Sequence, residues 1–526
     1  MTVKITSVRK KLKKPESSQQ SSDETNNLST SLDKNVQTIT EALGSSADII
    51  FRHFTFKKGY HVKVTVIYTD GLINDNTVQN NILDNLMVET KKTSSVPPHV
   101  DLFEYLHQSF LRSGEIEIVE NFDDLYNNVL SGNTLILLDH YAKCIAIDTR
   151  GWQERGLEEP TTETVIRGPK EGFNETLETN LALIRRRIKD PNLWIEKKII
   201  GKKSQTDVAI VYLNNVASEN VVHEVKTRIN GINIDAIIEG GQLEELIHDG
   251  FYTPFPTIYN TERPDTAVAG LLEGRVVIVV DGTPFVLLAP ALFTQFFQSP
   301  QDYYFQFDIS SFLRILRYVS FFLSLLVPSV YIALTTVHQE MLPTPLLITL
   351  TAQREGVPFP AVVEAFLMEL TFEILREAGV RMPRAVGSAI SIVGALVIGQ
   401  AAVEAGFVSS SMVIVVAITA IANFIMPNYN MSIPVRLLRF AFMIIASMLG
   451  LIGILFGLIA LTIHLCKLRS FGVPYMAPLT PLQGEEQKDT ILRLPWWTLK
   501  KRPGFMSKKN VLRNETPKPQ PESPSN

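Results

Sequence analysis

Two polar side chains interrupt a long apolar run in the C-terminal half of the chain. The stretch GALVIGQAAVEAG, residues 394–406, contains the amide of Gln400 and the carboxylate of Glu404. At helical spacing both share one face with Val393 and Val397. A charged group that faces lipid is costly, so such groups usually face a cavity, a partner or a pore. The pattern therefore indicates either the polar wall of an ion path or, because Glu404 lies near the end of its span, a carboxylate that reaches the membrane surface.

An acidic stripe precedes this run. In the amphipathic segment 360–380, Glu369, Glu373 and Glu377 follow one another at four-residue spacing. Carboxylates at this spacing repel by roughly 0.2–0.5 kcal/mol per pair on an exposed helix, so they need cations or arginines nearby. A ring of such helices would form a cation-attracting vestibule. Salt bridges would explain the stripe equally well, and the candidate partners are Arg376, Arg381 and Arg384.

Small residues recur at four-residue spacing in the same region. Small side chains at this spacing allow helix backbones to approach closely in lipid, where packing drives helix association. The packing could lie within one subunit or between subunits, and the pattern does not distinguish the two. The candidate pairs are Gly387 with Ser391, Ala446 with Gly450, and Gly453 with Gly457.

The sequence lacks the common catalytic and metal-binding motifs. It contains no G-x-S-x-G, Walker A, H-E-x-x-H or C-x-x-C pattern. Its nine histidines are dispersed, and its two cysteines are far apart in the chain. We therefore expect no enzymatic activity, no cofactor and no metal site. The net charge of −4 is small and gives no indication of nucleic acid as a partner.

The elements that precede these residues have the pattern of a soluble α/β protein. Residues 1–44 are polar and basic and are expected to be a disordered tail, without the apolar core of a signal peptide. Alternating strands and helical spacing then predict two small α/β subdomains, over 45–190 with a linking helix and over 191–300. An Asp-Gly pair splits the apolar segment 275–290, which favours a hairpin over a membrane span. We expect this whole region to be cytoplasmic.

The next region, 301–470, has the pattern of an all-α multi-pass membrane domain. The segment 341–380 is expected to be amphipathic or re-entrant. Residues 471–526 are expected to form a basic, Pro-rich and mostly unstructured tail. Four segments are long enough to cross a hydrocarbon core of roughly 30 Å, namely 318–336, 385–403, 409–426 and 440–463.

The basic residues give conflicting indications of membrane topology. Four spans keep both ends of the membrane domain inside, as Arg314 before them and Lys467 after them favour. The same arrangement leaves Arg376, Arg436 and their basic neighbours outside. Five spans would bring these arginines inside but would place the basic tail outside, so we prefer four.

Three stretches of the chain together resemble a known family. They are GFNETLETNLALIRRRIKDPNL, VDGTPFVLLAPALF, and the long run that begins FPAVVEAFLMELTFEILREAGVRMP and continues through GALVIGQAAVEAG to NYNMSIPVRLLRF. In combination they are similar to the A-subunit family of bacterial spore germinant receptors. The resemblance extends over about residues 45–480.

This resemblance implies a location, partners and a mechanism. It implies two α/β subdomains followed by a membrane domain in the inner membrane of the dormant spore. It also implies two partners, a transporter-like B subunit that binds the nutrient and a C-subunit lipoprotein. Members of the family are thought to form homo-oligomers that open a ligand-gated channel for monovalent cations. No residue of this chain can be carried over as a nutrient ligand.

Together these observations predict a channel-forming receptor subunit. The helix 385–403 would line the path, with Val397 and Val403 as an apolar constriction and with Gln400 and Glu404 as the polar wall. Three alternatives stay open: a paralogous accessory protein of germination without its own nutrient response, a secondary transporter, and a membrane-anchored scaffold. A transporter would show inverted repeats, and the sequence has no convincing repeat.

Overall fold

The computed structural model describes most of the chain as two compact units. The units are Met1–Arg155 with Leu181–Glu196, and Gly156–Asn180 with Lys197–Asn526. The expected domain boundaries at 190, 300 and 470 stay predictions. The described residues are 26–56, 62–91, 101–110, 115–151, 159–160, 162–250, 252–381, 399–484, 486–507 and 509–519.

The first unit is built on an antiparallel sheet of five strands in the order β1-β2-β4-β5-β3. Side chains alternate along each strand, so each strand contributes to two apolar layers. Val64 and Val66 of β2 lie in one layer, and Ile67 lies in the other. The strands are β1 (Ile49–Phe56), β2 (Val62–Thr69), β3 (Ile116–Val119), β4 (Asn133–Leu138) and β5 (Cys144–Asp148).

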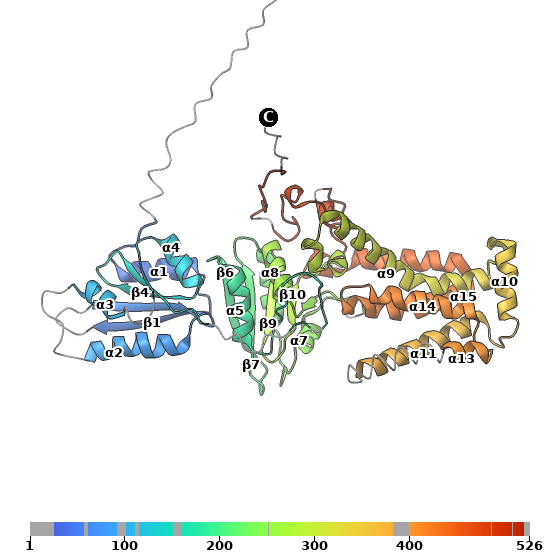
Figure 1. Cartoon of the computed structure of the whole chain (residues 1–526), viewed down its shortest axis with the longest axis horizontal. Helices are drawn as coiled ribbons and strands as arrows, with labels where there is room; N and C mark the ends of the chain where they lie inside the picture. Colours follow the sequence, from blue (N-terminus) through green and yellow to red (C-terminus); the bar gives the residue numbers. More distant parts are fainter. Residues whose placement is uncertain are drawn as a thin grey trace, which may run out of the picture. The chain divides into compact units, whose positions relative to one another are not determined.

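Helices cover both faces of this sheet (Figure 1). On one face α1 and α4 bury Ile39 and Leu125, and on the other α2 and α3 bury Leu86 and Leu106. This arrangement confirms the first α/β subdomain that the sequence predicts. The helices are α1 (Leu32–Ala42), the π-helical η1 (Thr77–Leu83), α2 (Asp84–Lys91), α3 (Leu102–Phe110) and α4 (Phe122–Leu130).

The expected disorder of residues 1–44 is wrong for the part that the structure describes. Leu32, Ile39 and Leu43 are 2%, 0% and 1% exposed at helix α1 and its C-cap. They recur at helical spacing, so the sheet buries one face of an otherwise polar helix. The polar average composition concealed this face. Residues 1–25 lie outside the described residues.

A second sheet has the strand order β6-β7-β9-β10-β8. Its hairpin pairs Ile278 with Leu287, and Gly282 has a φ of 87° in the turn. This pairing confirms the hairpin predicted over 275–290. The strands are β6 (Leu193–Ile200), β7 (Thr206–Leu213), β8 (Tyr259–Thr261), β9 (Val276–Val280) and β10 (Val286–Ala289), and the helices are α5 (Leu177–Arg187), α6 (Glu219–Asn230), α7 (Gly240–Ile247) and α8 (Pro264–Glu273).

A helical region follows the second sheet, which confirms the expected order of an α/β region and a helical membrane domain. Among the described residues, α9 (Phe307–Thr336) and α15 (Tyr429–Lys467) are long and apolar enough to cross a membrane. A third helix, α14 (Ser410–Phe424), is apolar but shorter. The other helices are α10 (Thr344–Arg354), α11 (Ala361–Arg381) and α13 (Gly399–Glu404).

Short elements connect these helices to one another and to the second sheet. A two-stranded ribbon lies directly after α15, so the chain leaves the helical region in an ordered conformation. The ribbon is β11 (Arg469–Ser470) with β12 (Val473–Pro474). The 3₁₀ turns are η2 (Phe293–Phe297), η3 (Pro300–Tyr303), η4 (Gln339–Met341), η6 (Glu486–Asp489) and η7 (Trp496–Thr498).

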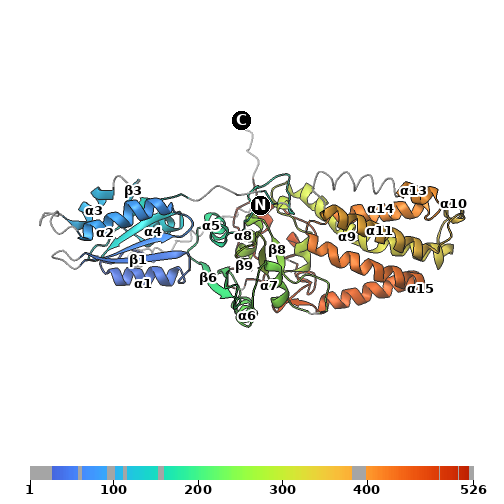
Figure 2. The same ribbon diagram turned by 90° about the horizontal axis from the view of Figure 1, so that it is seen from below.

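The helix α15 turns back on itself at Gly450. This glycine has φ 60° and ψ −142°, outside the helical region. Beyond the turn, Gly457 packs so closely on the ring of Phe442 that an added Cβ would lie 2.7 Å from it. The arms 429–449 and 451–467 therefore run antiparallel, and Figure 2 shows them meeting at one end.

This turn changes the expected organisation of the membrane domain. A single straight span over 440–463 is wrong, because φ/ψ values of this kind are accessible almost only to glycine and end the helix there. The structure places Ala446, Gly450 and Gly453 at or near the contact between the two arms. The remaining small-residue pair, Gly387 with Ser391, lies outside the described residues.

The C-terminal segment, by which we mean the described residues of 468–519, is folded. This corrects the expectation that the tail over 471–526 is mostly unstructured. Tyr475 and Met506 are fully buried. Arg502 donates through Nε to the carbonyl oxygen of Leu272 in α8 at 2.8 Å. A few well-separated anchors hold a polar segment, so its composition did not reveal that it folds.

Candidate functional site

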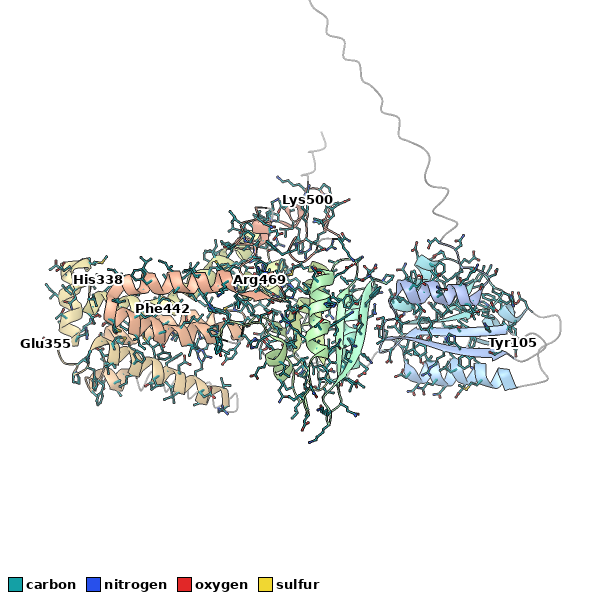
Figure 3. All side chains as sticks on the ribbon, turned by 180° about the vertical axis from the view of Figure 1, so that it is seen from behind. Tyr105, His338, Glu355, Phe442, Arg469 and Lys500 are labelled. Atoms are coloured by element: carbon teal, nitrogen blue, oxygen red, sulfur yellow. The ribbon has the colours of Figure 1, made fainter. Side chains whose placement is uncertain are left out.

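The helices of the second unit have a near end, beside the second sheet, and a far end. Figure 3 shows Arg469 at the near end, His338 and Glu355 at the far end, and Phe442 between them. Gly450 lies against His338, so the turn of α15 is at the far end. It follows that α9 and the first arm of α15 lead away from the second sheet, and that the second arm returns to it.

Five charged side chains meet among these helices, and we name them the charge cluster: Glu369, Glu373, Arg376, Arg436 and Arg439. Glu369 of α11 and Arg439 of α15 are 0% and 1% exposed and form an ion pair. Glu373 of α11 accepts from Arg436 of α15 at 2.9 Å. The two pairs lie one helical turn apart along both helices, so they attach α11 to the first arm of α15.

The charge cluster also reaches two further helices, α9 and α14. Arg439 donates to Ser324 Oγ of α9 at 3.3 Å. With its amide oxygen turned toward α11, Asn423 of α14 accepts from both terminal nitrogens of Arg376, at 2.8 and 2.9 Å. Arg376 also lies 3.7 Å from Glu373. Four helices are thus connected through one set of polar contacts.

The hydrogen bonding of the charge cluster is incomplete among the described residues. One carboxylate oxygen of Glu369 and one of Glu373 have no hydrogen-bond partner there, and neither does the Nε of each cluster arginine. Such atoms are costly to bury, and they are rarely left unpaired without a reason. Buried ion pairs contribute little net stability compared with apolar packing. The cluster is therefore better explained by a function that needs polar groups among these helices.

The acidic stripe predicted from the sequence is divided in the structure. Glu369 and Glu373 point into the bundle toward α15, while Glu377 is exposed and pairs with Arg381 at 2.6 Å. The partners predicted from the sequence are arginines of the same segment, and they do not include Arg436 and Arg439. The only indication of these two arginines in the sequence was that the four-span topology leaves them on the outer side of the membrane. Arg384 lies outside the described residues.

Three of the predicted pore residues, Gln400, Val403 and Glu404, lie at the far end. Gln400 donates to Glu404 at 2.9 Å on the short helix α13, and both side chains are exposed. Val403 is partly buried against the core around Met412. The remaining candidates, Val393 and Val397, lie outside the described residues. A pore-lining role for this helix stays a prediction.

A second polar contact joins three elements at the far end. The fully buried Glu364 of α11 pairs with Arg354 of α10 at 3.2 Å. Its other oxygen accepts from the backbone N–H of Ser409 at 3.0 Å and from the Ser409 hydroxyl at 2.9 Å. The same hydroxyl caps α14 by accepting from the N–H of Met412 at 3.3 Å.

Replacing Ser409 with alanine is expected to lower the free energy of unfolding by roughly 1–3 kcal/mol. The variant removes a helix cap and a hydrogen bond to a buried carboxylate. Thermal unfolding of the purified protein in detergent measures this loss. Ser411→Ala is the matched control, because this hydroxyl bonds to Tyr331 and Ser409 and does not contact the carboxylate. An equal loss in both variants would contradict the assignment.

A third polar contact fixes the near end of α9. The fully buried Asp302 of η3 pairs with Arg314 at 3.3 Å and with Arg317 at 2.7 Å. Arg314 also pairs with Asp489 of the C-terminal segment at 2.9 Å. Burial raises the pKa of Asp489, and the Arg314 guanidinium opposes this effect. The first turns of α9 are therefore held both by η3, which follows the second sheet in the chain, and by the C-terminal segment.

The chain is similar to spore germination proteins over most of its length. It matches the family described as Bacillus/Clostridium GerA spore germination protein over residues 37–505. It is 49% identical over 486 residues to spore germination protein KA of Bacillus subtilis strain 168, covering 92% of this chain and 88% of that protein. It is 41% identical over 483 residues to the uncharacterized membrane protein YfkQ of the same strain, covering 92% and 93%.

A solved structure shows further similarity. The N-terminal domain of the A subunit of the Bacillus megaterium spore germinant receptor GerK3 is 36% identical to this chain. The similarity covers 51% of this chain and 97% of that domain, with a TM-score of 0.41.

Proposed function

This chain belongs to the GerA family as an A subunit of a spore germinant receptor, and we propose that several copies of it form a gated cation channel. The family consists of receptor subunits and is not an enzyme family. The protein is a membrane protein with a soluble N-terminal region and two candidate spans among the described residues. Conduction, oligomerisation and the identity of the permeant ion are the proposed part.

The charge cluster is the observation that carries this proposal. Ionisable groups among membrane helices are expensive, and they commonly mark ion pathways or elements that change arrangement. Here they join α9, α11, α14 and α15, and several of their atoms lack hydrogen-bond partners among the described residues. A rearrangement that exchanges these partners would move several helices together. We propose that this rearrangement accompanies opening.

The turn at Gly450 suggests a revised membrane topology. If both arms of α15 cross, the crossings are α9, α11, the predicted span 385–403, α14 and the two arms, six in all. An even number keeps the N-terminal region and the C-terminal segment on one side. It also brings Arg376 and Arg436 to the near end, together with Lys467, which the positive-inside rule assigns to the cytoplasm. The conflict between four and five spans then disappears.

The ion path is proposed to run along the segment 385–403. Val397 and Val403 would form the apolar constriction, which excludes water in the closed state. The hydrogen-bonded pair of Gln400 and Glu404 would form the polar wall beside it. The exposure of this pair in one protomer supports the idea that neighbouring copies complete the path.

The proposed partners follow from the family. They are a B subunit that resembles a transporter and binds the nutrient, a C-subunit lipoprotein, further copies of this chain and the lipid bilayer, in the inner membrane of the spore. Nutrient binding to the B subunit would favour the open state. An accessory germination protein without its own nutrient response is the second candidate.

Ion flux through the purified protein in liposomes tests the channel proposal. Vesicles loaded with a potassium-sensitive dye and containing the whole receptor should release potassium when the nutrient is added. A scaffold would give no flux under any condition, and an accessory protein would give flux without a response to nutrient. Transport that saturates and needs a counter-substrate would favour a secondary transporter.

Replacing Glu404 with alanine is expected to slow cation release several-fold and to weaken the preference for cations over anions. The loss of its negative charge removes the attraction of the polar wall for cations. Stopped-flow measurements with potassium and chloride gradients report both quantities. Glu340→Ala is the control, because this exposed carboxylate also lies near the far end but outside α13. Unchanged release by a normally inserted Glu404 variant would refute the polar-wall assignment.

A further inference from the structure

A cavity of about 330 Å³ lies where the second sheet meets the loop that begins α15. All of its lining belongs to the second unit. Three carboxylic side chains line it: Glu244 of α7, Glu239 at the N-cap of α7, and Glu163 of the segment ahead of α5. Asn260, Asn428 and Tyr429 also line it.

A chain of hydrogen bonds leads from this cavity to α15. The Tyr259 hydroxyl donates to Glu163 at 3.3 Å and is itself bonded by the side chain of Asn428. Asn428 is the N-cap of α15, and its side-chain oxygen accepts from the N–H of Asn430 at 3.0 Å. The hydroxyl of Thr261 donates to the second oxygen of Glu163. The state of one carboxyl group is thus connected to the first turn of a membrane helix.

Two of the three carboxyl groups are poised to titrate near neutral pH. Burial raises the pKa of Glu163 to about 7, and the hydrogen bonds from Thr261 and Tyr259 offset this only partly. Burial also raises the pKa of Glu244 to about 7, with a hydrogen bond from Asn260 acting in the opposite direction. The neighbouring charge of Glu239 adds to the shift at Glu244.

The charged groups around the cavity do not neutralise these carboxylates. Arg263 favours ionised Glu163, but its guanidinium is held by Asp265 at 2.8 Å, and Glu262 opposes it. On α7, Glu239 accepts from its own helix N-terminus at 2.6 Å. Among the described residues, no ion pair includes Glu163, Glu239 or Glu244. Arg275 pairs with Glu273 at 3.5 Å and acts on Tyr259 and not on a cavity carboxylate.

The cavity wall formed by Tyr429 is connected to the charge cluster. The Tyr429 ring lies 5.7 Å from the guanidinium of Arg436, which in turn pairs with Glu373 at 2.9 Å. Arg439 follows one turn further along the same arm. A movement of the loop 428–430 would therefore act on Arg436 through Tyr429, and on Arg439 through the helical turn between them.

We propose that protonation controls how firmly the start of α15 is held against the second sheet. The contact around this cavity, which we name the joint, is closed when Glu163 and Glu244 are neutral and opens when both are ionised. Ionisation places three negative charges around one cavity. Their mutual repulsion and their hydration favour an opened cavity, and opening frees the loop 428–430, which forms one of its walls. The joint needs no ion path, so its failure and the failure of the channel proposal are distinguishable.

The direction of the pH dependence follows from linkage. Each carboxyl has an ordinary value of 4.5 and a higher pKa of about 7 in the folded protein, so the folded protein holds the proton more tightly. The stability that the bound proton gives to the closed joint is complete below the ordinary pKa and is lost as pH rises through the folded pKa. The joint is therefore tightest in acid, loosens between about pH 4.5 and 7, and changes little above that range.

Hydrogen exchange of the full chain in lipid nanodiscs tests the joint. After correction for the intrinsic pH dependence of exchange, protection of the amides of residues 430–433 should fall about tenfold between pH 5.5 and pH 8. The double variant Glu163→Gln/Glu244→Gln should stay protected at both values. Glu245→Gln is the matched control, because this exposed residue lies next to Glu244 on α7 and should behave like the unmodified chain.

A second variant keeps the test decisive if the double substitution impairs folding. Tyr259→Phe keeps both carboxyl groups but breaks the hydrogen-bond chain to Asn428. It should lower protection of the α15 start at pH 5.5 and flatten the pH response. Equal pH responses in the unmodified chain and either variant would overturn the proposal, and so would an unmodified chain whose protection does not change with pH.

Discussion

An Arg439→Met variant is expected to lose about 3–5 kcal/mol of folding free energy. The substitution removes the partner of Glu369, a fully buried carboxylate among membrane helices, and leaves its charge uncompensated. It also removes the donor to Ser324 on α9. Thermal unfolding in detergent, together with the amount of protein inserted in the membrane, measures the loss.

Two companion variants separate the structural role of this pair from its functional role. Arg381→Met breaks the exposed pair with Glu377, where the side chains are 77% and 64% exposed, and should cost less than about 1 kcal/mol. The double variant Glu369→Leu/Arg439→Met replaces both charges with apolar groups and should recover most of the stability. We expect it to insert normally but to release few or no ions in response to nutrient.

The double variant also tests whether the charge cluster supports the channel proposal. If it recovers stability and ion release together, the pair is structural, and the charge cluster no longer supports the channel. If Arg439→Met alone costs no more than Arg381→Met, the pair is not buried as described.

A Gly450→Ala variant is expected to prevent α15 from forming its hairpin. The glycine's backbone conformation alone costs another residue about 1–3 kcal/mol. A Cβ at this position would also lie 2.3 Å from the ring of His338 and 3.0 Å from the Cβ of Val337. The His338 ring can rotate away, but Val337 is fixed on the end of α9. The strain and the contact therefore add, and the two arms should not reach their positions.

Protease protection of the C-terminal segment reports this outcome. If the arms no longer pair, the chain after residue 450 should be displaced, and the segment should be cleaved in vesicles in which the native protein is protected. Gly356→Ala is the matched control, because this glycine also lies near the far end and has no neighbouring atom within 4 Å of the added Cβ. A protected Gly450 variant with native stability would show that α15 does not need this turn.

Local patterns in the sequence predicted the soluble fold well. Alternation along HVKVTVIYTDG and the Asp-Gly pair within 275–290 predicted strands and a hairpin, and both are present. These features depend on neighbours a few residues apart, which a single sequence displays. The polar composition around α1 and in the C-terminal segment was misleading, because a few buried residues hold each of them.

Periodicity and composition carry no information on pairing between distant segments. Glu369 and Arg439 are 70 positions apart, and only the packing of α11 on α15 makes them partners. The hairpin of α15 was missed for a related reason. The spacing of Gly450 from Ala446 predicts a packing residue inside a helix, but hydropathy alone cannot distinguish such a glycine from one that ends the helix.

The sequence by itself determined that an α/β region precedes an apolar helical region, that no common catalytic motif is present, and which family the chain resembles. These properties are carried by composition, by periodicity and by contiguous stretches of residues. Only the tertiary structure decided which charges are paired, where α15 turns, and that Glu163 is linked to the start of that helix. The physical reason is that the free energy of a buried charge depends on the groups around it, and these are brought together by packing between segments that the sequence presents far apart.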